Sequence, residues 1–146
     1  MSLRDKLKVI GLSSLLIATS SFVSPSCNVQ PSEAIVQRYN VEDLNKYNFN
    51  KEVLESKLPV LVDFYTPWCH YCKEAEPYIK KFEKEFRGKI KFFRYNCDED
   101  HSIPDKYNVE GYPTFIIYSK GKASDRVIGF DMEQLKAMLL KYSKRK

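Results

Sequence analysis

A nearly continuous hydrophobic run occupies residues 60–65, interrupted only by Asp63. Its length and its β-branched and aromatic side chains are typical of a strand buried on both faces of a sheet. Similar segments recur further along the chain, and a Ser-Lys-Gly-Lys turn signal joins the last two of them. The predicted strands are residues 35–39, 60–65, 89–95, 114–118 and 126–128.

Apolar positions spaced three and four apart predict the helices. Ile79, Phe82 and Phe86 share one face of a helix that Gly88 ends, and Asp131 is expected to cap the last helix. A first helix is predicted to begin at a cap formed by Asn48 or Asn50 and to run to about Lys57. Its apolar side consists of Val53, Leu54 and Leu58. The other predicted helices are residues 69–86, 102–107 and 132–142. This order of elements predicts an α/β fold, a central mixed β-sheet flanked by helices on both faces.

The N-terminal segment has the pattern of a targeting signal. Three basic residues in positions 1–8 precede an uncharged stretch whose apolar part covers residues 9–23, about 15 residues. This is shorter than the ~20 residues that cross a bilayer. We therefore expect residues 1–26 to be a signal peptide or an N-terminal membrane anchor, with a small-residue cleavage site at Ala18-Thr19-Ser20.

This leader predicts an exported protein, in the periplasm or another extracytoplasmic space. Residues 27–34 are interpreted as a linker and residues 35–146 as one domain. Cys27 lies just after the leader, where lipidation would tether the protein, although the preceding Ser-Pro-Ser departs from the usual small-residue pattern. An uncleaved leader would tether it in the same way.

Composition agrees with one globular domain that does not bind nucleic acid. The 146 residues are 43% hydrophobic and carry a formal net charge of +5, which excludes global disorder. Without residues 1–20 the chain loses three basic residues and one acidic residue. The basic C-terminus lacks interleaved aromatic side chains, so it is interpreted as a solvated helix end.

Four cysteines are too few for a disulfide scaffold of this length, and two of them form a Cys-x-x-Cys motif. Cys69 and Cys72 are placed where a strand gives way to a helix, so the helix N-terminus favours a thiolate at Cys69. His70, if protonated, would add a positive charge beside it. A zinc site is the alternative, with Cys97 and His101 as further ligands.

The spacing argues against zinc. Twenty-four residues separate Cys72 from Cys97, more than the roughly 12–20 typical of such sites. Cys97 ends a predicted strand, where a free cysteine is usually a small core residue. His101 follows three acidic residues and is interpreted as an exposed loop side chain. We therefore expect no metal and no cofactor.

The chain from about residue 35 to residue 144 resembles the thioredoxin family. The motifs that carry this resemblance are Val62-Asp63-Phe64, Trp68-Cys69-x-x-Cys72-Lys73, Pro77, Lys106-Tyr107-x-Val109-x-Gly111-Tyr112-Pro113-Thr114, Gly121 and Gly129. The resemblance implies a thioredoxin fold. It also implies that Cys69 is an exposed nucleophile and Cys72 the resolving thiol.

Other roles follow from the same resemblance. Pro113 would be cis, so that the Tyr112 backbone can pair with an extended substrate. Trp68 would shield the disulfide; the alternative interpretation is simple core packing. Asp63, whose pKa burial should raise, would accept the proton of Cys72. Arg94 stands where the family has a lysine, which puts a proton relay through it in doubt because arginine keeps its proton.

His70 and Tyr71 differ from the family's Gly-Pro, so the direction of exchange stays open. A histidine beside Cys69 favours an oxidising protein. The sequence thus predicts a monomeric, exported thiol–disulfide oxidoreductase acting on protein substrates with disulfides or dithiols. One alternative is a specialised reductant of exported thiols, fed by a membrane redox partner. Another is a non-catalytic binding or metal module.

Overall fold

The computed structural model describes residues 41–144. The predicted leader, the linker and the strand at 35–39 lie outside the described residues. All described residues belong to one compact unit, Gln37–Lys146. Since this unit contains both hydrophobic cores described below, we expect it to fold without the residues that precede it.

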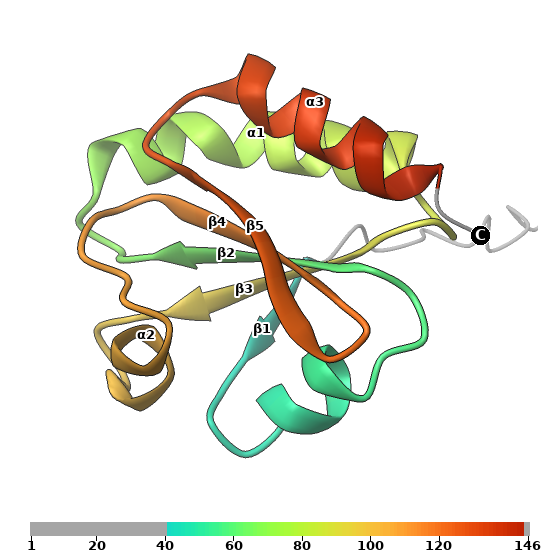
Figure 1. Ribbon diagram of the computed structural model, residues 1–146. Coiled ribbons are helices and arrows are strands. Elements are labelled where there is room, and N and C mark those ends of the chain that lie inside the picture. The colour runs from blue at the N-terminus through green and yellow to red at the C-terminus, as the bar shows by residue number, and fades with distance from the viewer. Residues whose placement is uncertain (1–40, 145–146) are drawn as a thin grey trace, which may run out of the picture. The chain divides into compact units, whose positions relative to one another are not determined.

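A five-stranded mixed sheet forms the centre of the fold (Figure 1). Its order is β1-β3-β2-β4-β5, with β1, β3 and β2 parallel, β4 antiparallel to β2, and β5 antiparallel to β4. The strands are β1 (Glu42–Leu44), β2 (Val60–Tyr65), β3 (Lys91–Asn96), β4 (Thr114–Ser119) and β5 (Lys122–Ile128).

Helices cover both faces of this sheet. The helices are η1 (Asn50–Leu54), α1 (His70–Glu85), α2 (Ser102–Lys106) and α3 (Met132–Ser143). Helices α1 and α3 lie on one face, and α2 and the π-helix η1 lie on the other (Figure 1). The predicted mixed sheet with helices on both faces is confirmed.

Strand β2 contributes to two hydrophobic cores because successive side chains point to opposite faces. Leu61 packs with side chains of α1 and α3, such as Ile79 and Leu139, whereas Val62 packs with Val53 of η1 on the other face. Each fully buried side chain of this size contributes roughly 1.5–3 kcal/mol. The same alternation places Asp63 on the face that α1 and α3 cover.

The helix caps show which local predictions hold. Asp131 caps α3 as expected, because its carboxylate accepts a hydrogen bond of 2.9 Å from the Gln134 N–H. The predicted cap by Asn48 or Asn50 is wrong: the Asn48 side chain accepts from the Asn45 N–H at 2.8 Å within the preceding turn.

The first helix is also shorter than predicted. It ends at Leu54 instead of near Lys57, since a turn follows in which the Ser56 hydroxyl donates to the Leu58 carbonyl at 2.9 Å. Leu58 is 38% exposed, so its assignment to an apolar helix face is wrong.

The β4–β5 hairpin is held against η1. Lys120 and Gly121 both have positive φ, 55° and 74°, as a tight hairpin turn requires. A Cβ atom at position 121 would lie 2.9 Å from the Leu54 carbonyl oxygen, so only glycine allows this approach. Strand β5 starts right after the turn and is longer than predicted. Among the described residues, no helix has the length and apolar character needed to cross a membrane.

Candidate active site at the start of helix α1

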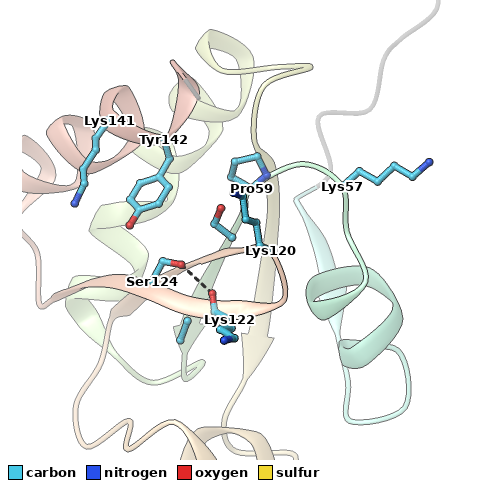
Figure 2. A pocket seen from close by; sticks show the side chains of 9 residues that line it. Lys57, Pro59, Lys120, Lys122, Ser124, Lys141 and Tyr142 are labelled. Atoms are coloured by element: carbon cyan, nitrogen blue, oxygen red, sulfur yellow. Dashed lines mark hydrogen bonds between the residues drawn. The ribbon is translucent and has the colours of Figure 1, made fainter. Parts of the chain in front are cut away.

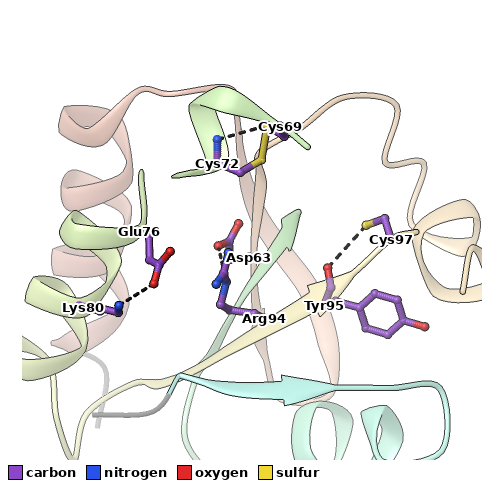
Figure 3. Close-up of polar contacts among 8 residues, drawn as sticks. All are labelled: Asp63, Cys69, Cys72, Glu76, Lys80, Arg94, Tyr95 and Cys97. Carbon is purple, nitrogen blue, oxygen red and sulfur yellow. Dashed lines mark hydrogen bonds and ion pairs between the residues drawn. A yellow bond between two sulfur atoms is a disulfide. The ribbon is translucent and has the colours of Figure 1, made fainter. Parts of the chain in front are cut away.

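The two motif cysteines form a disulfide where β2 leads into α1 (Figure 3). Their Cα atoms are 5.3 Å apart. Cys69 is the N-cap of α1, and its sulfur accepts a hydrogen bond of 3.2 Å from the Cys72 N–H. An N–H group at a helix N-terminus stabilises negative charge, so this position favours a thiolate at Cys69 once the disulfide is reduced.

Cys69 is less accessible than the sequence predicts. Its side chain is 6% exposed and that of Cys72 is 1% exposed, so the expectation of an exposed nucleophile is wrong in degree. The Cys69 sulfur is covered because it is bonded to Cys72 and sits over the first turn of α1. It is still the more accessible of the two.

Asp63 lies beneath the disulfide in the middle of the sheet (Figure 3). Its side chain is 1% exposed. Loss of hydration raises the pKa of this carboxyl from 3.8 to about 7, even though the nearby Arg94 charge acts in the opposite direction. The predicted burial is therefore confirmed, and near neutral pH this group can both take up and release a proton.

Arg94 is opposite Asp63 on β3, in register with it. Its Nε lies 3.3 Å from an Asp63 carboxylate oxygen, but among the described residues neither carboxylate oxygen nor this nitrogen finds a hydrogen-bond partner. The guanidinium carbon lies 3.8 Å from the centre of the Tyr65 ring. Arg94 therefore provides a permanent positive charge at the site, and its contact with the Tyr65 ring holds the guanidinium group in place.

A second ion pair lies on α1 near this buried pair (Figure 3). Glu76 contacts Lys80 at 2.5 Å, and this contact lowers the pKa of Glu76. Glu76 is therefore ionised at neutral pH, and its negative charge helps raise the pKa of Asp63.

Trp68 is a surface side chain of the site. It is 68% exposed, which excludes the alternative that it packs in the core. Its indole Nε1 donates a hydrogen bond of 3.1 Å to Asp98, and its ring meets the Tyr112 ring edge to face at 6.1 Å. These two contacts hold an exposed aromatic plane beside the disulfide.

The two residues between the cysteines face outward. The His70 Nε2 lies 3.1 Å from a Glu74 carboxylate oxygen one helical turn later. Tyr71 is 58% exposed. A protonated His70 would thus share its charge with Glu74, which weakens its influence on Cys69.

The loop before β4 reaches the site through Tyr112, whose ring contacts that of Trp68. The peptide bond between Tyr112 and Pro113 is cis. The Thr114 hydroxyl donates to the Gly111 carbonyl at 2.7 Å, and the Gly129 N–H donates to the Pro113 carbonyl at 2.8 Å. Hydrogen bonds on both sides of Pro113 therefore fix the backbone around it.

Cys97 is a buried thiol at the end of β3. It is 0% exposed and donates to the Tyr95 carbonyl with a sulfur–oxygen distance of 3.7 Å. Burial raises the pKa of this thiol to about 12, so it stays protonated. Within residues 41–144, no group of three or more His, Cys, Asp or Glu side chains is arranged to hold a metal ion.

The structure thus brings together the predicted site residues around the disulfide and adds partners that the sequence did not reveal. Asp98, Glu74 and Tyr65 were not among the candidates. The acidic residues after β3 were visible, but only the fold shows that one of them reaches Trp68, thirty positions earlier.

Comparison with known proteins agrees with this site. The family model described as Thioredoxin matches residues 40–141. A thioredoxin of Rickettsia felis is 43% identical over 86 residues, which are 59% of this chain and 82% of that protein. The chloroplastic thioredoxin M-type of Spinacia oleracea is 39% identical over 98 residues, covering 67% of this chain and 52% of that protein.

A solved structure shows the same fold. The crystal structure of Malassezia sympodialis thioredoxin superposes with a TM-score of 0.66 at 28% identity, covering 71% of this chain and 91% of that chain. With the family match, the sheet topology and the Cys69–Cys72 disulfide, these findings place the chain in the thioredoxin family, as a thiol–disulfide oxidoreductase of thioredoxin fold.

Proposed function

We propose that this protein is exported and exchanges disulfides with other proteins, with Cys69 as the attacking thiol and Cys72 as the resolving thiol. The observation that carries this assignment is the N-cap position of Cys69, whose sulfur accepts the Cys72 N–H while Cys72 is the more buried of the pair. The sulfur that a helix N-terminus stabilises as a thiolate is the better nucleophile at neutral pH.

The exchange has two steps. The Cys69 thiolate attacks one sulfur of a substrate disulfide, that bond breaks, and the departing substrate sulfur takes a proton from solvent. Cys72 then gives its proton to the Asp63 carboxylate and attacks the Cys69 sulfur, which expels the second substrate sulfur as a thiolate. This thiolate takes up a proton from solvent, and Asp63 returns the proton it received to solvent. The substrate gains two electrons and two protons, and the protein is left with the Cys69–Cys72 disulfide. Run backwards, the same steps oxidise a dithiol.

Asp63 is suited to the second step because burial brings its pKa to about 7. A carboxylate with an ordinary pKa would be a weak base at neutral pH, whereas this one is near the value that general base catalysis favours. Trp68 directly precedes Cys69, and its ring contacts that of Tyr112. We assign Trp68 and the backbone at Tyr112 to contact with the substrate chain.

Exchange through mixed disulfides can be tested by trapping. Cys72→Ser should accumulate covalent complexes with a protein substrate such as insulin, visible on non-reducing gels, because the release step is lost. Cys69→Ser should form none and should not reduce insulin. Cys97→Ser is the matched control and should behave like the unmodified protein. Full insulin reduction by the Cys69→Ser variant would contradict the assignment.

The proposal that the protein is exported rests on the leader pattern of residues 1–26. It covers an exported protein that stays at a membrane through an uncleaved leader or through a lipid on Cys27. Fusing residues 1–40 to alkaline phosphatase tests it, since that reporter is active only after export from the bacterial cytoplasm. A fusion as inactive as one that lacks residues 1–26 would rule export out.

A second candidate is a dedicated reductant fed by a membrane redox partner. The contact between His70 and Glu74 favours keeping this candidate, since it weakens the argument for an oxidant. Equilibration of the disulfide in glutathione buffers decides between the two. A potential near about −270 mV supports the reductant, and one near about −120 mV supports the oxidant.

A further inference from the structure

An open cavity of about 940 Å³ lies at the end of the sheet where the β4–β5 hairpin turns (Figure 2). We call it the lysine groove. It is lined by the loop before β2, the hairpin and the end of α3, and no acidic side chain lines it. The residues that define it are Lys57, Pro59, Lys120, Lys122, Ser124 and Lys141.

Three of its lysines make no ion pair within the part of the chain that the structure describes. Lys57, Lys120 and Lys122 are exposed, and within residues 41–144 none of them makes an ion pair with a carboxylate. Lys141 differs, since it contacts Asp125 at 2.8 Å. Three like charges around one cavity attract an anionic partner that spans them.

The backbone that carries these lysines is fixed. Gly121 packs against the Leu54 carbonyl, which holds the hairpin to η1 next to the loop that contains Lys57. The Ser124 hydroxyl donates to the Lys122 carbonyl at 3.0 Å within β5 (Figure 2), and Lys122 pairs with Ser119 across the hairpin. The lysine side chains can rotate, but the backbone positions that carry them are fixed relative to one another.

The groove and the disulfide are at opposite ends of the sheet. The groove adjoins the start of β2, and the disulfide follows the end of β2. Strand β1 runs parallel to β2 through β3, so β1 and β2 both run from the groove end of the sheet toward the disulfide end. The disulfide end instead carries the acidic run 98–100 directly after β3.

We propose that the lysine groove docks the domain on a bilayer that contains anionic phospholipids, with the Cys69–Cys72 disulfide facing away from the membrane. Lysines are point charges that suit a fluid layer of headgroup phosphates, whereas the shape-specific capture of one anion usually employs arginine. Leu58 lies between two groove residues and is 38% exposed, which suits the boundary between headgroups and acyl chains. This proposal rests on the proposed export in one respect, which is the choice of membrane that the protein meets.

Vesicle binding tests the proposal. Residues 37–146 should sediment with vesicles of mixed phosphatidylglycerol and phosphatidylcholine, less so at higher salt, and not with phosphatidylcholine alone. Each lysine near an anionic surface contributes about a fivefold gain in binding. A variant with Lys57→Gln, Lys120→Asn and Lys122→Gln should therefore bind about a hundredfold more weakly; asparagine is chosen at position 120 because it tolerates the positive φ.

The matched control removes three lysines elsewhere. Lys81→Gln, Lys106→Gln and Lys136→Gln together make the same change in net charge, spread over three helices, and should keep most of the binding. Equal weakening of the two triple variants would overturn the proposal, because net charge alone would then explain binding. Absence of binding by the unmodified domain would overturn it too.

Two further measurements close the alternatives. Inorganic phosphate or soluble polyglutamate that binds as tightly as vesicles, with the same dependence on the groove lysines, would replace the membrane by a free anion or an acidic protein. Lys57→Glu, a single change on an exposed loop, should weaken vesicle binding about thirtyfold even if the triple variant fails to fold. Insulin reduction is followed in parallel: its loss with vesicle binding intact would count against the proposed function and not against docking.

Discussion

Asp63 and Arg94 face each other across two parallel strands, 3.3 Å apart, with Asp63 almost fully buried. The charge of Arg94 does not bring the pKa of Asp63 back to its usual value, since this pKa is still raised to about 7. Loss of hydration outweighs the opposite charge, as is common for buried ion pairs. The fold therefore holds a carboxyl group that is partly protonated at neutral pH directly below its disulfide.

Asp63→Asn should stabilise the protein at alkaline pH. The folded protein keeps a proton on Asp63 between pH 3.8 and about 7 that the unfolded chain releases. Stability from this group is thus complete below pH 3.8 and is lost as the pH rises through about 7. We expect a gain on the order of 4 kcal/mol at pH 8 and little near pH 4, measured by urea unfolding. A gain that does not vary with pH would contradict this.

Arg94→Met should shift the pH dependence of disulfide release. Removing the positive charge raises the pKa of Asp63 further, so the rise in rate with pH should move to higher pH and the rate at pH 7 should fall. Single-turnover release from a mixed disulfide at Cys69 measures this. Arg94→Lys retains the charge and should keep a profile closer to that of the unmodified protein; equal profiles for Met and Lys would count against the argument.

Asp98→Ala should weaken the reduction of protein substrates. It removes the acceptor for the Trp68 indole N–H, and a hydrogen bond of this kind contributes roughly 0.5–1.5 kcal/mol. We expect KM for insulin to rise about two- to tenfold, while exchange with a small disulfide changes little. Asp98→Asn keeps an acceptor oxygen and should restore most of KM. An equal loss on both substrates would point to damage at the cysteines themselves.

Cys97 should resist alkylation in the folded protein. With its pKa raised to about 12 and its side chain fully buried, only about one thiol in ten thousand is ionised at pH 8. Iodoacetamide added to reduced residues 37–146 should therefore modify Cys69 first and leave Cys97 intact until denaturant is added. Mass spectrometry of the peptides identifies the sites, and early labelling at Cys97 would refute the prediction.

Gly121→Ala should destabilise the hairpin more than Gly88→Ala destabilises the end of α1. Both glycines have nearly the same positive φ, 74° and 75°, so the backbone strain of alanine, about 1–2 kcal/mol, is common to both. Only at position 121 does the added Cβ meet the Leu54 carbonyl at 2.9 Å. Equal melting temperatures of the two variants would show that the hairpin moves aside without penalty.

The parts of the fold that the sequence predicts best are those that depend on local pattern. Residues 60–65 are a buried strand as predicted, and α1 lies within the predicted range because Ile79 and Phe82 repeat at helical spacing. Strand β1 was not predicted. Its three residues, Glu-Asp-Leu, have weak strand preference and pair with β3 through backbone hydrogen bonds, which any residue type can make.

The site divides in the same way. The cysteines and Asp63 follow from a motif and from a charge inside a hydrophobic strand, both visible in the sequence. The partner of Trp68 was not visible, since Asp98 comes close only after β3 pairs with β2. The exposure of Cys69 was overestimated because the sequence cannot show how closely the first turn of α1 covers its sulfur.

Trp68 is the only tryptophan in the chain, and it stands exposed beside the disulfide. All indole fluorescence of this protein therefore comes from its redox site, and disulfides quench nearby indoles. The emission of the unmodified chain is consequently a direct, label-free signal of the oxidation state of Cys69 and Cys72. Stopped-flow records of that emission can time each exchange step while the protein works on its substrate.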